Sequence, residues 1–305
     1  MNWRAKAAAQ GVFSYAPYGD RLNYLFQRRV TKTLPPPDRV FSEAATTARD
    51  HLGAFKRHAG RAVGDATFFE FGAGWNLAVP MALAALGVQH QVVIDVRELT
   101  KLDLLQHTVT RLQALAPSLG LQSPPAPFSP ANDEGDRAAR AVLGLYGIDY
   151  RAPSDARATD LESQSIDCIT STSTFEHLRA GDVLAILGEC HRVLREDGVM
   201  STWIDYKDHY SYFDANIGPF NFLRYSNRTW ALWSPPLHHQ NRLRHCDFVR
   251  LFGEAGFTIV EEERVEGTEA DLAEVERLRP AERFRSYPRR ELVVRDGRLV
   301  ARRIG

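Results

Sequence analysis

The chain of 305 residues has 38 basic and 38 acidic side chains and is 44% hydrophobic, a composition typical of globular proteins and not of disordered or fibrous ones. A formal net charge of zero provides no overall field to attract nucleic acid, so we expect no nucleic-acid partner. Because no apolar run approaches the ~18 residues that span a bilayer and the N-terminus lacks a signal-peptide core, we expect a cytoplasmic protein.

The charges are unevenly distributed along the chain. Residues 1–40 hold seven Lys or Arg against two acids, residues 261–276 hold eight acids against one Arg, and residues 277–303 hold ten Arg against three acids. We expect the last two segments to pair with each other or to form solvated faces. Three widely spaced cysteines show no metal or redox pattern, which agrees with a reducing compartment.

The first sixty residues predict a helical N-terminal cap. Apolar and aromatic residues recur with rough helical periodicity over residues 3–32, interrupted by a turn-like APYGD, which predicts two short helices. Three prolines at 35–37 end the second helix, and a third helix is predicted over 42–58 with Ser42 as its N-cap. This cap could line a substrate mouth, rest on a membrane surface as a peripheral contact, or only cover a sheet face.

The segment FFEFGAGWN at 68–76 predicts a buried strand that turns through glycines into a helix. Gly72 and Gly74 allow backbone conformations closed to other residues, and the unpaired N–H groups of the next helix, over 76–86, favour an anionic or polar ligand. A strand over 92–96 then carries Asp95, about twenty residues past the turn, where a carboxylate suits the hydroxyls of an adenosine ribose.

Two features depart from the dinucleotide-binding fingerprint. Asn76 stands where a third glycine belongs, and an acid, Glu70, lies at the end of the strand. With the downstream blocks SIDCITSTSTFEHL (165–178) and ECHRVLREDGVMSTWIDY (189–206), the segment resembles the class I S-adenosylmethionine-dependent methyltransferases, close to their type 11 small-molecule members. The resemblance covers about residues 66–263.

This resemblance implies an α/β fold: a Rossmann-like, doubly wound, mostly parallel seven-stranded sheet with helices on both faces, formed by residues 61–305 behind the cap of residues 1–60. It implies S-adenosyl-L-methionine as the cofactor. A polar residue after the third strand would meet the adenine amine, and a residue at the end of the fourth strand would face the ligand crevice. The cofactor-binding candidates are Glu70, Gly72, Ala73, Gly74, Asp95, Asp155 and Thr172.

The later elements alternate between strand and helix, as a parallel sheet requires. Residues 117–130 contain five prolines and predict a loop between the helical segments 99–115 and 133–145. The remaining predicted strands are 148–151, 166–172, 199–206, 257–262 and a strand or hairpin at 291–304 broken at 296–297. The remaining predicted helices are 180–194, 245–254 and 266–278.

Residues 207–243 are too long for an ordinary connection and contain eight aromatic residues. Such a segment cannot stay fully solvated, so we expect it to pack as a lid or a substrate wall. Aromatic rings mixed with amide, guanidinium and imidazole groups suit stacking on sugar faces and bonding hydroxyls. The substrate-binding candidates are Tyr210, Arg224, Tyr225, Trp230, His239 and Asn241.

Methyl transfer needs a base only when the acceptor must lose a proton. Our catalytic candidates are His209, tuned by the adjacent Asp208, and His177, which would contact the methionine end of the cofactor or make only a structural hydrogen bond. Asp205, Asp208 and His209 could also bind a divalent cation, but their close spacing lacks a ligand signature, and we expect no metal.

The predicted function is S-adenosylmethionine-dependent methylation, by O-methylation, of a small-molecule or sugar-containing acceptor such as a lipid-linked precursor. An NAD(P)-dependent oxidoreductase would use the same glycine turn, but Glu70 and the missing third glycine count against it. A non-catalytic cofactor-binding partner protein, docking through its basic N-terminal segment, is the non-enzymatic alternative. No RNA-binding module supports an RNA methyltransferase, and no oligomeric state is predicted.

Overall fold

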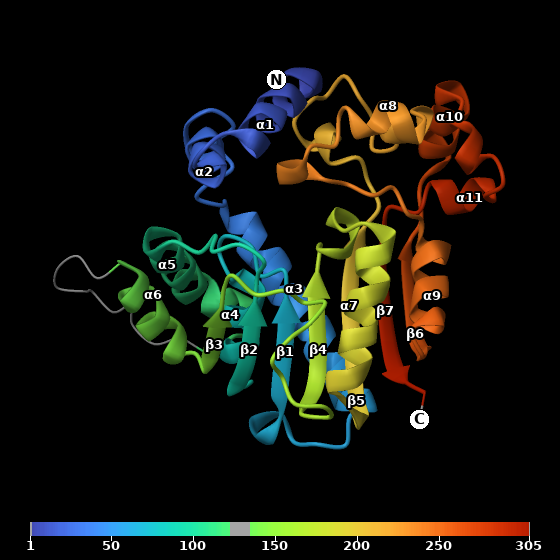
Figure 1. The fold of residues 1–305 in the computed structure, drawn as a ribbon. Helices are drawn as coiled ribbons and strands as arrows, with labels where there is room; N and C mark the ends of the chain where they lie inside the picture. Colours follow the sequence, from blue (N-terminus) through green and yellow to red (C-terminus); the bar gives the residue numbers. More distant parts are fainter. Residues whose placement is uncertain (1, 123–134, 305) are drawn as a thin grey trace.

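A seven-stranded sheet forms the centre of the computed structural model, which describes residues 2–122 and 135–304 (Figure 1). The strand order is β3-β2-β1-β4-β5-β7-β6. The first five strands in this order pair in parallel, whereas β7 runs antiparallel to both β5 and β6. The strands are β1 (Thr67–Phe71), β2 (His90–Ile94), β3 (Ile148–Arg151), β4 (Ile166–Thr172), β5 (Leu194–Asp205), β6 (Phe257–Val265) and β7 (Asp296–Arg303). The mostly parallel seven-stranded α/β fold predicted from the sequence is confirmed.

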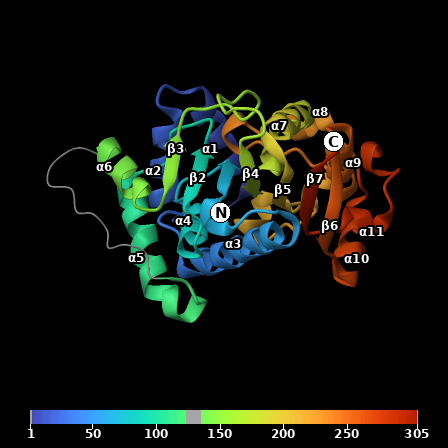
Figure 2. The same ribbon diagram turned by 90° about the horizontal axis from the view of Figure 1, so that it is seen from below.

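Helices cover both faces of this sheet (Figures 1 and 2). α3 (Asp38–His58), α4 (Ala78–Ala85) and α5 (Leu102–Leu119) lie on one face, and α7 (Ala180–Val193) and α9 (His245–Glu254) lie on the other. α6 (Gly135–Gly144) packs beside the edge strand β3. Because the central strands are buried on both faces, β1 and β4 read as nearly continuous buried runs.

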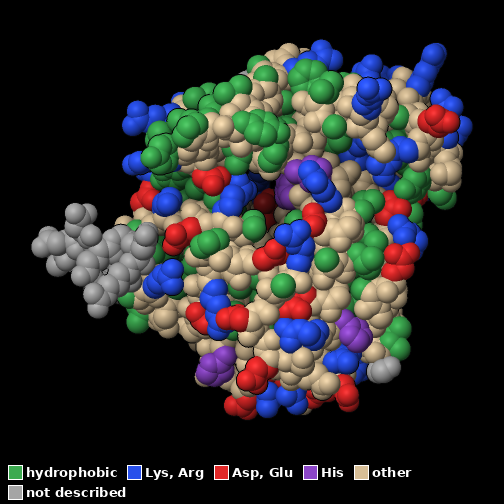
Figure 3. Space-filling view, in the orientation of Figure 1, with side chains coloured by type: hydrophobic (Ala, Val, Ile, Leu, Met, Phe, Trp, Pro, Cys, Tyr) green, Lys and Arg blue, Asp and Glu red, His purple; other side chains and the backbone are tan. Residues whose placement is uncertain are grey.

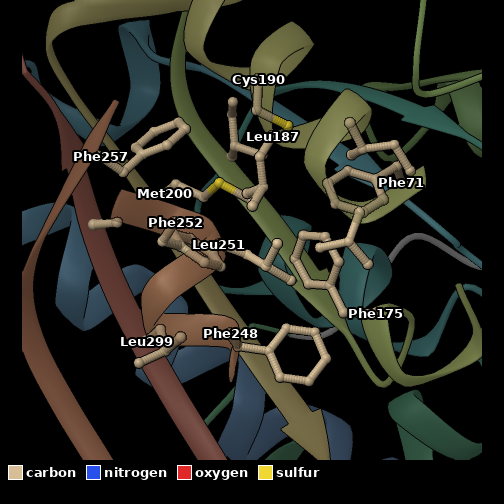
Figure 4. Packing of buried hydrophobic residues seen from close by; sticks show 14 of the residues in the cluster. Phe71, Phe175, Leu187, Cys190, Met200, Phe248, Leu251, Phe252, Phe257 and Leu299 are labelled. Carbon is tan, nitrogen blue, oxygen red and sulfur yellow. The ribbon is translucent and has the colours of Figure 1, made fainter. Parts of the chain in front are cut away.

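The face of the sheet under α7 and α9 holds the largest buried cluster (Figure 4). Phe71 of β1 and Phe175 meet edge to face with ring centroids 5.4 Å apart, and Phe252 of α9 packs against the same Phe175 ring at 6.0 Å. Such aromatic contacts contribute beyond their buried area, by about 0.5–1.5 kcal/mol each. Because Phe175 follows shortly after β4, this cluster fixes the position of the turn after β4, where several candidate site residues lie.

The N-terminal segment divides between two places. α3 packs against the sheet and α4, whereas α1 (Trp3–Tyr15) and α2 (Gly19–Arg29) lie above the carboxyl ends of the strands (Figure 1). The Arg28 guanidinium at the end of α2 is paired with Asp103 of α5, and Arg97 reaches Asp20 at 2.9 Å. These ion pairs attach α2 to the loop and helix that follow β2.

Residues 207–243 fold into short helical turns instead of an open loop. These are η3 (His209–Tyr212), η4 (Asn221–Arg224), α8 (Asn227–Ala231) and η5 (Pro236–His238). Together with α1, α10 (Glu269–Leu278), η6 (Glu282–Phe284) and α11 (Arg289–Leu292), they form a second layer above the sheet, with its own buried cluster around Tyr210 and Trp230. The aromatic residues of this segment therefore pack into this layer instead of remaining solvated.

Several predicted boundaries are wrong by a few residues. α3 begins at Asp38, since Pro37 occupies the N-cap position, and Ser42 lies inside the helix with its hydroxyl bonded to the Asp38 carbonyl. α5 continues through Pro117 to Leu119 and ends at Gly120, whose positive φ is a common helix stop. The rest of the predicted proline-rich loop, residues 123–134, lies outside the described residues.

Strand ends also differ from the predictions. β2 ends at Ile94, so Asp95 follows the strand. β5 begins at Leu194, before Gly198, with an irregular register against β4 at that point. The predicted break at 296–297 is instead the start of the single strand β7, and α10 begins at Glu269, after the Thr268 capping box.

The two oppositely charged C-terminal segments pair with each other, as predicted. Arg295 binds Asp271 at 2.8 Å, and Arg298 reaches Glu261 and Glu263 at 3.3 and 3.2 Å. The Asp271 and Arg298 side chains are largely buried, so salt screens these pairs less than it screens pairs on the surface. None of the described helices is both long and apolar enough to cross a lipid bilayer.

Candidate active site

The glycine turn after β1 and the acid after β2 form one hydrogen-bonded unit. Gly72 and Gly74 have φ of +78° and +68°, in the left-handed region that favours glycine. A Cβ at Gly72 would lie 2.2 Å from the Thr174 hydroxyl, so only glycine fits, whereas a Cβ at Gly74 would point into open space. The Gly74 N–H donates to Oδ2 of Asp95 at 3.0 Å, and the Arg97 N–H donates to Oδ1 at 3.0 Å.

This unit borders a cavity of about 950 Å³ at the carboxyl ends of the parallel strands. In an open parallel sheet this is the edge where ligands bind. The hollow is visible in Figure 3 beneath the surface of the N-terminal helices. Its wall draws on four parts of the chain: α1 and α2, the loops after β1 and β2, the loops after β3 and β4, and the segment 207–243.

The predicted cofactor residues divide between the cavity wall and the core. Gly72, Gly74, Asp95 and Asp155 line the cavity. The Asp155 carboxylate is held by Arg157 at 2.7 Å, which lowers its pKa. Ala73 packs against the buried cluster of α4 and α5 instead of the cavity.

Glu70 and Thr172 are not among the residues that line the cavity. The buried Glu70 carboxylate accepts the Thr170 hydroxyl hydrogen bond at 2.9 Å, and burial raises the pKa of Glu70 to about 7. Thr172 shares a hydrogen bond of 3.1 Å with the ring of His51, a buried residue of α3. Both side chains therefore connect secondary-structure elements under the site.

A cluster of imidazoles and carboxylates forms the opposite part of the cavity wall. His177 and His209 line the cavity, with ring centroids 4.9 Å apart. Nε2 of His209 lies 3.3 Å from Oδ2 of Asp205 and 4.0 Å from Oε1 of Glu176. The Tyr212 hydroxyl donates to Asp205 as well, and its ring stacks on His209. These groups can bind a proton or a cation at the cavity wall.

Burial and neighbouring charges set the protonation of this cluster. Burial, with the charge of Asp205, raises the pKa of Glu176 well above its usual range. Burial also acts to raise the pKa of Asp205, but His209 and Lys207 outweigh it, and that pKa is lowered. Burial and the adjacent His209 lower the pKa of His177 to about 4, so His177 is neutral near pH 7.

Asp208 is not the carboxylate that His209 faces. The Asp208 side chain is fully buried and accepts hydrogen bonds from the Tyr210 N–H at 3.0 Å and the Asn221 amide at 3.1 Å. Side chains of adjacent residues leave the backbone in different directions, so neighbours in sequence need not meet. The group nearest to the His209 ring nitrogen is Asp205, four residues earlier.

Of the six predicted substrate residues, only His239 lines the cavity. Tyr210 and Trp230 are buried in the wall, where their polar atoms donate to the carbonyls of Trp233 and Gln240. Tyr225 packs beside Trp230, and Arg224 is exposed over the Tyr225 ring. Aromatic side chains bury most surface by packing on each other, which leaves few of them for a ligand.

Asn241 has a positioning role in this arrangement. Its side-chain amide donates to the carbonyls of Phe175 and Leu178 at 2.7 and 2.8 Å, and its backbone N–H donates to the Glu176 carbonyl at 2.8 Å. Nδ1 of His177 is 2.7 Å from the His239 carbonyl. These hydrogen bonds from the segment 207–243 hold the turn that carries Glu176 and His177 in position.

Sequence reasoning missed the polar residues that α1 and α2 bring to the cavity. Lys6, Gln10 and Asn23 are buried and line it, and burial lowers the pKa of Lys6 to about 7. Oε1 of Gln10 and Oδ1 of Asn23 have no hydrogen-bond partner. The one sequence signal for these residues was their place on the buried face of helices that are otherwise aromatic or basic.

The match to a known family lies in the middle of the chain. A family model described as a methyltransferase domain matches residues 130–202, a segment that includes β3, β4, α7 and most of β5. The turn that carries Glu176 and His177 falls within this match. No curated protein gives a significant match to this sequence.

Solved structures resemble this chain at low sequence identity. The geranyl diphosphate C-methyltransferase of Streptomyces coelicolor A3(2), solved with Mg²⁺, geranyl diphosphate and S-adenosyl-L-homocysteine, is 13% identical, with a TM-score of 0.48 over 85% of this chain and 79% of that one. The YcgJ protein of Bacillus subtilis is 14% identical, with a TM-score of 0.42 over 84% of this chain and 100% of that one. A SAM-dependent methyltransferase of Methanosarcina mazei is 13% identical, with a TM-score of 0.42 over 80% and 94%. At these identities the likeness concerns the fold alone.

Proposed function

We propose that the chain is an S-adenosylmethionine-dependent methyltransferase that transfers the cofactor's methyl group to a hydroxyl oxygen of a sugar-containing or other small-molecule acceptor, and the match of residues 130–202 to a methyltransferase-domain model supports this. The observation that carries the proposal is one continuous cavity. It joins the glycine turn at Gly74 and Asp95 to the imidazoles of His177 and His209. A volume of about 950 Å³ is at the upper end of the range typical of small-molecule sites.

The residues at the turn fit S-adenosylmethionine. The open space in front of Gly74 admits a ligand to the backbone, and the Asp95 carboxylate keeps lone pairs for ribose hydroxyls beside the two N–H groups that fix it. Bound there, the cofactor supplies an electrophilic methyl group on a positively charged sulfur. We assign Gly72, Gly74 and Asp95 to the cofactor, and Asp155 to its adenine end.

The imidazoles of His177 and His209 in the cavity wall would act on the acceptor. In-line displacement depends on holding the acceptor oxygen close to the methyl carbon with water excluded. The His209 imidazole, whose Nε2 lies 3.3 Å from Oδ2 of Asp205, can take the proton that the hydroxyl loses. His177 borders the same space, held by its hydrogen bond to the His239 carbonyl at 2.7 Å.

The polar groups of α1 and α2 favour an acceptor with several hydroxyls. Gln10 and Asn23 line the cavity, and each has a buried carbonyl oxygen without a partner, which is costly unless a ligand donates to it. Aromatic rings of Trp75, Tyr212 and Phe213 line the same cavity and suit the apolar faces of a sugar.

The outer surface of α1 and α2 favours an acceptor that is joined to a lipid. Apolar side chains there are exposed beside basic ones, and Figure 3 shows hydrophobic side chains gathered on this part of the surface, above the hollow. Exposed apolar patches near a site mark contacts with membranes or partners. The exposed apolar residues of this surface are Val12, Tyr15, Tyr18, Leu22, Leu25 and Val30. We propose a peripheral membrane contact through them.

An acceptor panel tests this function. Purified protein is incubated with methyl-labelled S-adenosylmethionine and nucleotide sugars, lipid-linked saccharides, phenols and a protein mixture, and label transfer is counted. We expect transfer to a saccharide, with higher rates when a lipid-linked saccharide is presented in vesicles. Transfer to a phenol or a protein and to no saccharide would refute the proposed acceptor class.

A vesicle-binding control separates the membrane contact from catalysis. The Tyr15→Ser and Tyr18→Ser double variant removes two of the most exposed rings of α1 and α2, at 84% and 81% exposure. It should act on a water-soluble saccharide at the wild-type rate and lose the vesicle-dependent gain. Equal rates for variant and wild type on vesicles would refute the contact.

A further inference from the structure

We propose that Glu176, His177 and His209 bind one divalent transition-metal ion of the zinc type in the cavity wall. One ligand atom from each side chain lies within 4.8 Å of the others. The three residues come from two separate turns, the one after β4 and the one after β5, which the sheet brings to the same edge. The set differs from the one considered from the sequence, because Glu176 and His177 stand in place of Asp205 and Asp208.

Glu176 gives the first reason for a cation here. Its side chain is 2% exposed, and neither of its carboxylate oxygens has a hydrogen-bond partner. A buried carboxylate without partners is unfavourable unless a cation or a proton compensates it. The closest basic group recorded for it is the His209 ring, at 4.0 Å. The Glu176 oxygens therefore have free lone pairs beside the two imidazoles.

His177 is held in the form that a metal requires. Its Nδ1 is 2.7 Å from the His239 carbonyl oxygen, and since a carbonyl only accepts, Nδ1 carries the hydrogen. Nε2 of the neutral ring then carries a lone pair. Metal-binding histidines commonly donate their other ring N–H to a carbonyl or carboxylate in this way, which fixes the tautomer and the orientation of the ring.

His209 supplies the third donor atom. Its Nε2 makes no hydrogen bond of good geometry, although it lies between Glu176 at 4.0 Å and Asp205 at 3.3 Å. Bonds of about 2.1 Å to a tetrahedral ion place ligand atoms roughly 3.4 Å apart, so the site would close by about 1 Å through side-chain rotation. With Asp205 adjacent, the two carboxylates balance the charge of one divalent ion.

The donor set indicates which ion would bind. Two imidazole nitrogens and a carboxylate form one of the known catalytic zinc sets, which leaves a further position for water or substrate. Mg²⁺ and Ca²⁺ prefer six or more oxygen ligands and are disfavoured here. His177 and His209 line the cavity, so the remaining position faces the space assigned to the acceptor.

The inference deepens the proposed function and rests on it for its chemical role. An ion at this site would bind the acceptor hydroxyl and lower its pKa, so the hydroxyl could lose its proton to water before methyl transfer without using the His209 lone pair. Metal binding itself does not depend on methyl transfer. Measuring the ion directly therefore distinguishes a failure of the metal site from a failure of the proposed acceptor class.

The test uses the full chain, stripped with a chelator and then dialysed. Zn²⁺ is added, unbound ion is removed by gel filtration, and zinc per chain is measured by plasma mass spectrometry. Co²⁺ is added to a second sample, and the visible absorption reports its ligands. The Glu176→Gln and His209→Asn variants remove donors, and the His58→Asn variant, which alters a histidine paired with Glu261 at 2.6 Å elsewhere in the fold, is the control.

We expect about one zinc per chain in the wild type and in the His58→Asn control, and at least ~100-fold weaker binding in both donor variants. X-ray absorption of the zinc-loaded wild type should show imidazole ligands, which keeps the test decisive even if a variant fails to fold. No retained zinc, equal retention in folded donor variants, or an all-oxygen ligand shell would each overturn the proposal.

Discussion

The backbone N–H of Gly74 donates to Oδ2 of Asp95 over 3.0 Å, which joins the turn after β1 to the acid after β2. The second carboxylate oxygen is fixed by the Arg97 N–H at the same distance. The two N–H groups hold the carboxylate rigidly at the cavity wall, where a ribose can use its remaining lone pairs. Preorganised groups of this kind bind with little loss of conformational entropy.

Asp95→Asn should therefore weaken cofactor binding. The new amide group would either turn a donor toward the Gly74 N–H or lose a charged hydrogen bond to the ribose, at a cost of about 2–3 kcal/mol. We expect S-adenosylhomocysteine to bind roughly 30- to 150-fold more weakly by calorimetry. Asp197→Asn, an exposed change in β5, is the control. Unchanged affinity in Asp95→Asn would show that the ribose lies elsewhere.

Gly72→Ala and Gly74→Ala should separate stability from binding. Both force alanine into the left-handed region, at about 1–2 kcal/mol, but only the Cβ at Gly72 collides with Thr174, which adds about 1–3 kcal/mol. Thermal unfolding should show the larger loss for Gly72→Ala, whereas Gly74→Ala should lose more cofactor affinity than stability. Equal melting temperatures for the two variants would contradict the geometry.

The buried Glu70 carboxyl should make the free energy of unfolding depend on pH. Burial raises its pKa from 4.5 to about 7 in the folded protein, so between these values the folded state holds a proton that the unfolded state releases. The stabilising contribution of Glu70 is therefore fully present below pH 4.5 and is lost as the pH rises to 7, by about 3 kcal/mol. Glu70→Gln lacks this loss. In urea unfolding, its advantage over wild type should grow from pH 4.5 to 7 and then level off.

The exposed Glu43→Gln change, in an i,i+4 pair with Arg39, is the matched control for Glu70→Gln and should show no such growth. A difference between Glu70→Gln and wild type that stays constant over this pH range would mean that Glu70 is charged in the folded protein.

His209→Asn should lower turnover without weakening the cofactor. Losing a base, or a metal ligand that does the same task, costs about 10²–10⁴ in kcat. Binding of S-adenosylhomocysteine, which depends on the turn at Gly74, should stay within about twofold of wild type. His58→Asn, outside the cavity, should keep full activity. A wild-type kcat in His209→Asn would remove His209 from the reaction.

The sequence predicted the sheet well because buried parallel strands read as continuous apolar runs. The segment at 68–76 also predicted the turn, since two glycines followed by a later acid are typical of a ligand-binding turn between a strand and a helix. Helix ends were predicted less well: Ser42 can cap a helix, but α3 already begins at Asp38, after Pro37, which makes no side-chain capping hydrogen bond. A local cap signal does not fix where a helix starts when the residues before it can also be helical.

The cluster around His177 and His209 was predicted only in part. His177 and His209 were recognised from their places after strands, but their partners come from tertiary contacts that no local pattern encodes. Asp205 replaced Asp208 because of side-chain direction, and Glu176 gained importance only once its lack of partners was visible. Gln10 of α1 lies more than sixty residues before the glycine turn, so nothing in its surroundings indicated the cavity.

The most direct test of the account is ¹³C NMR of the reaction with S-adenosyl-L-[methyl-¹³C]methionine and the acceptor found in the panel. The account predicts a new ¹³C-methoxy signal on the saccharide, formed in equal amount with S-adenosylhomocysteine and strongly reduced in His209→Asn. A ¹³C-methyl group on carbon or nitrogen, or S-adenosylhomocysteine formed without any methylated acceptor, would contradict it.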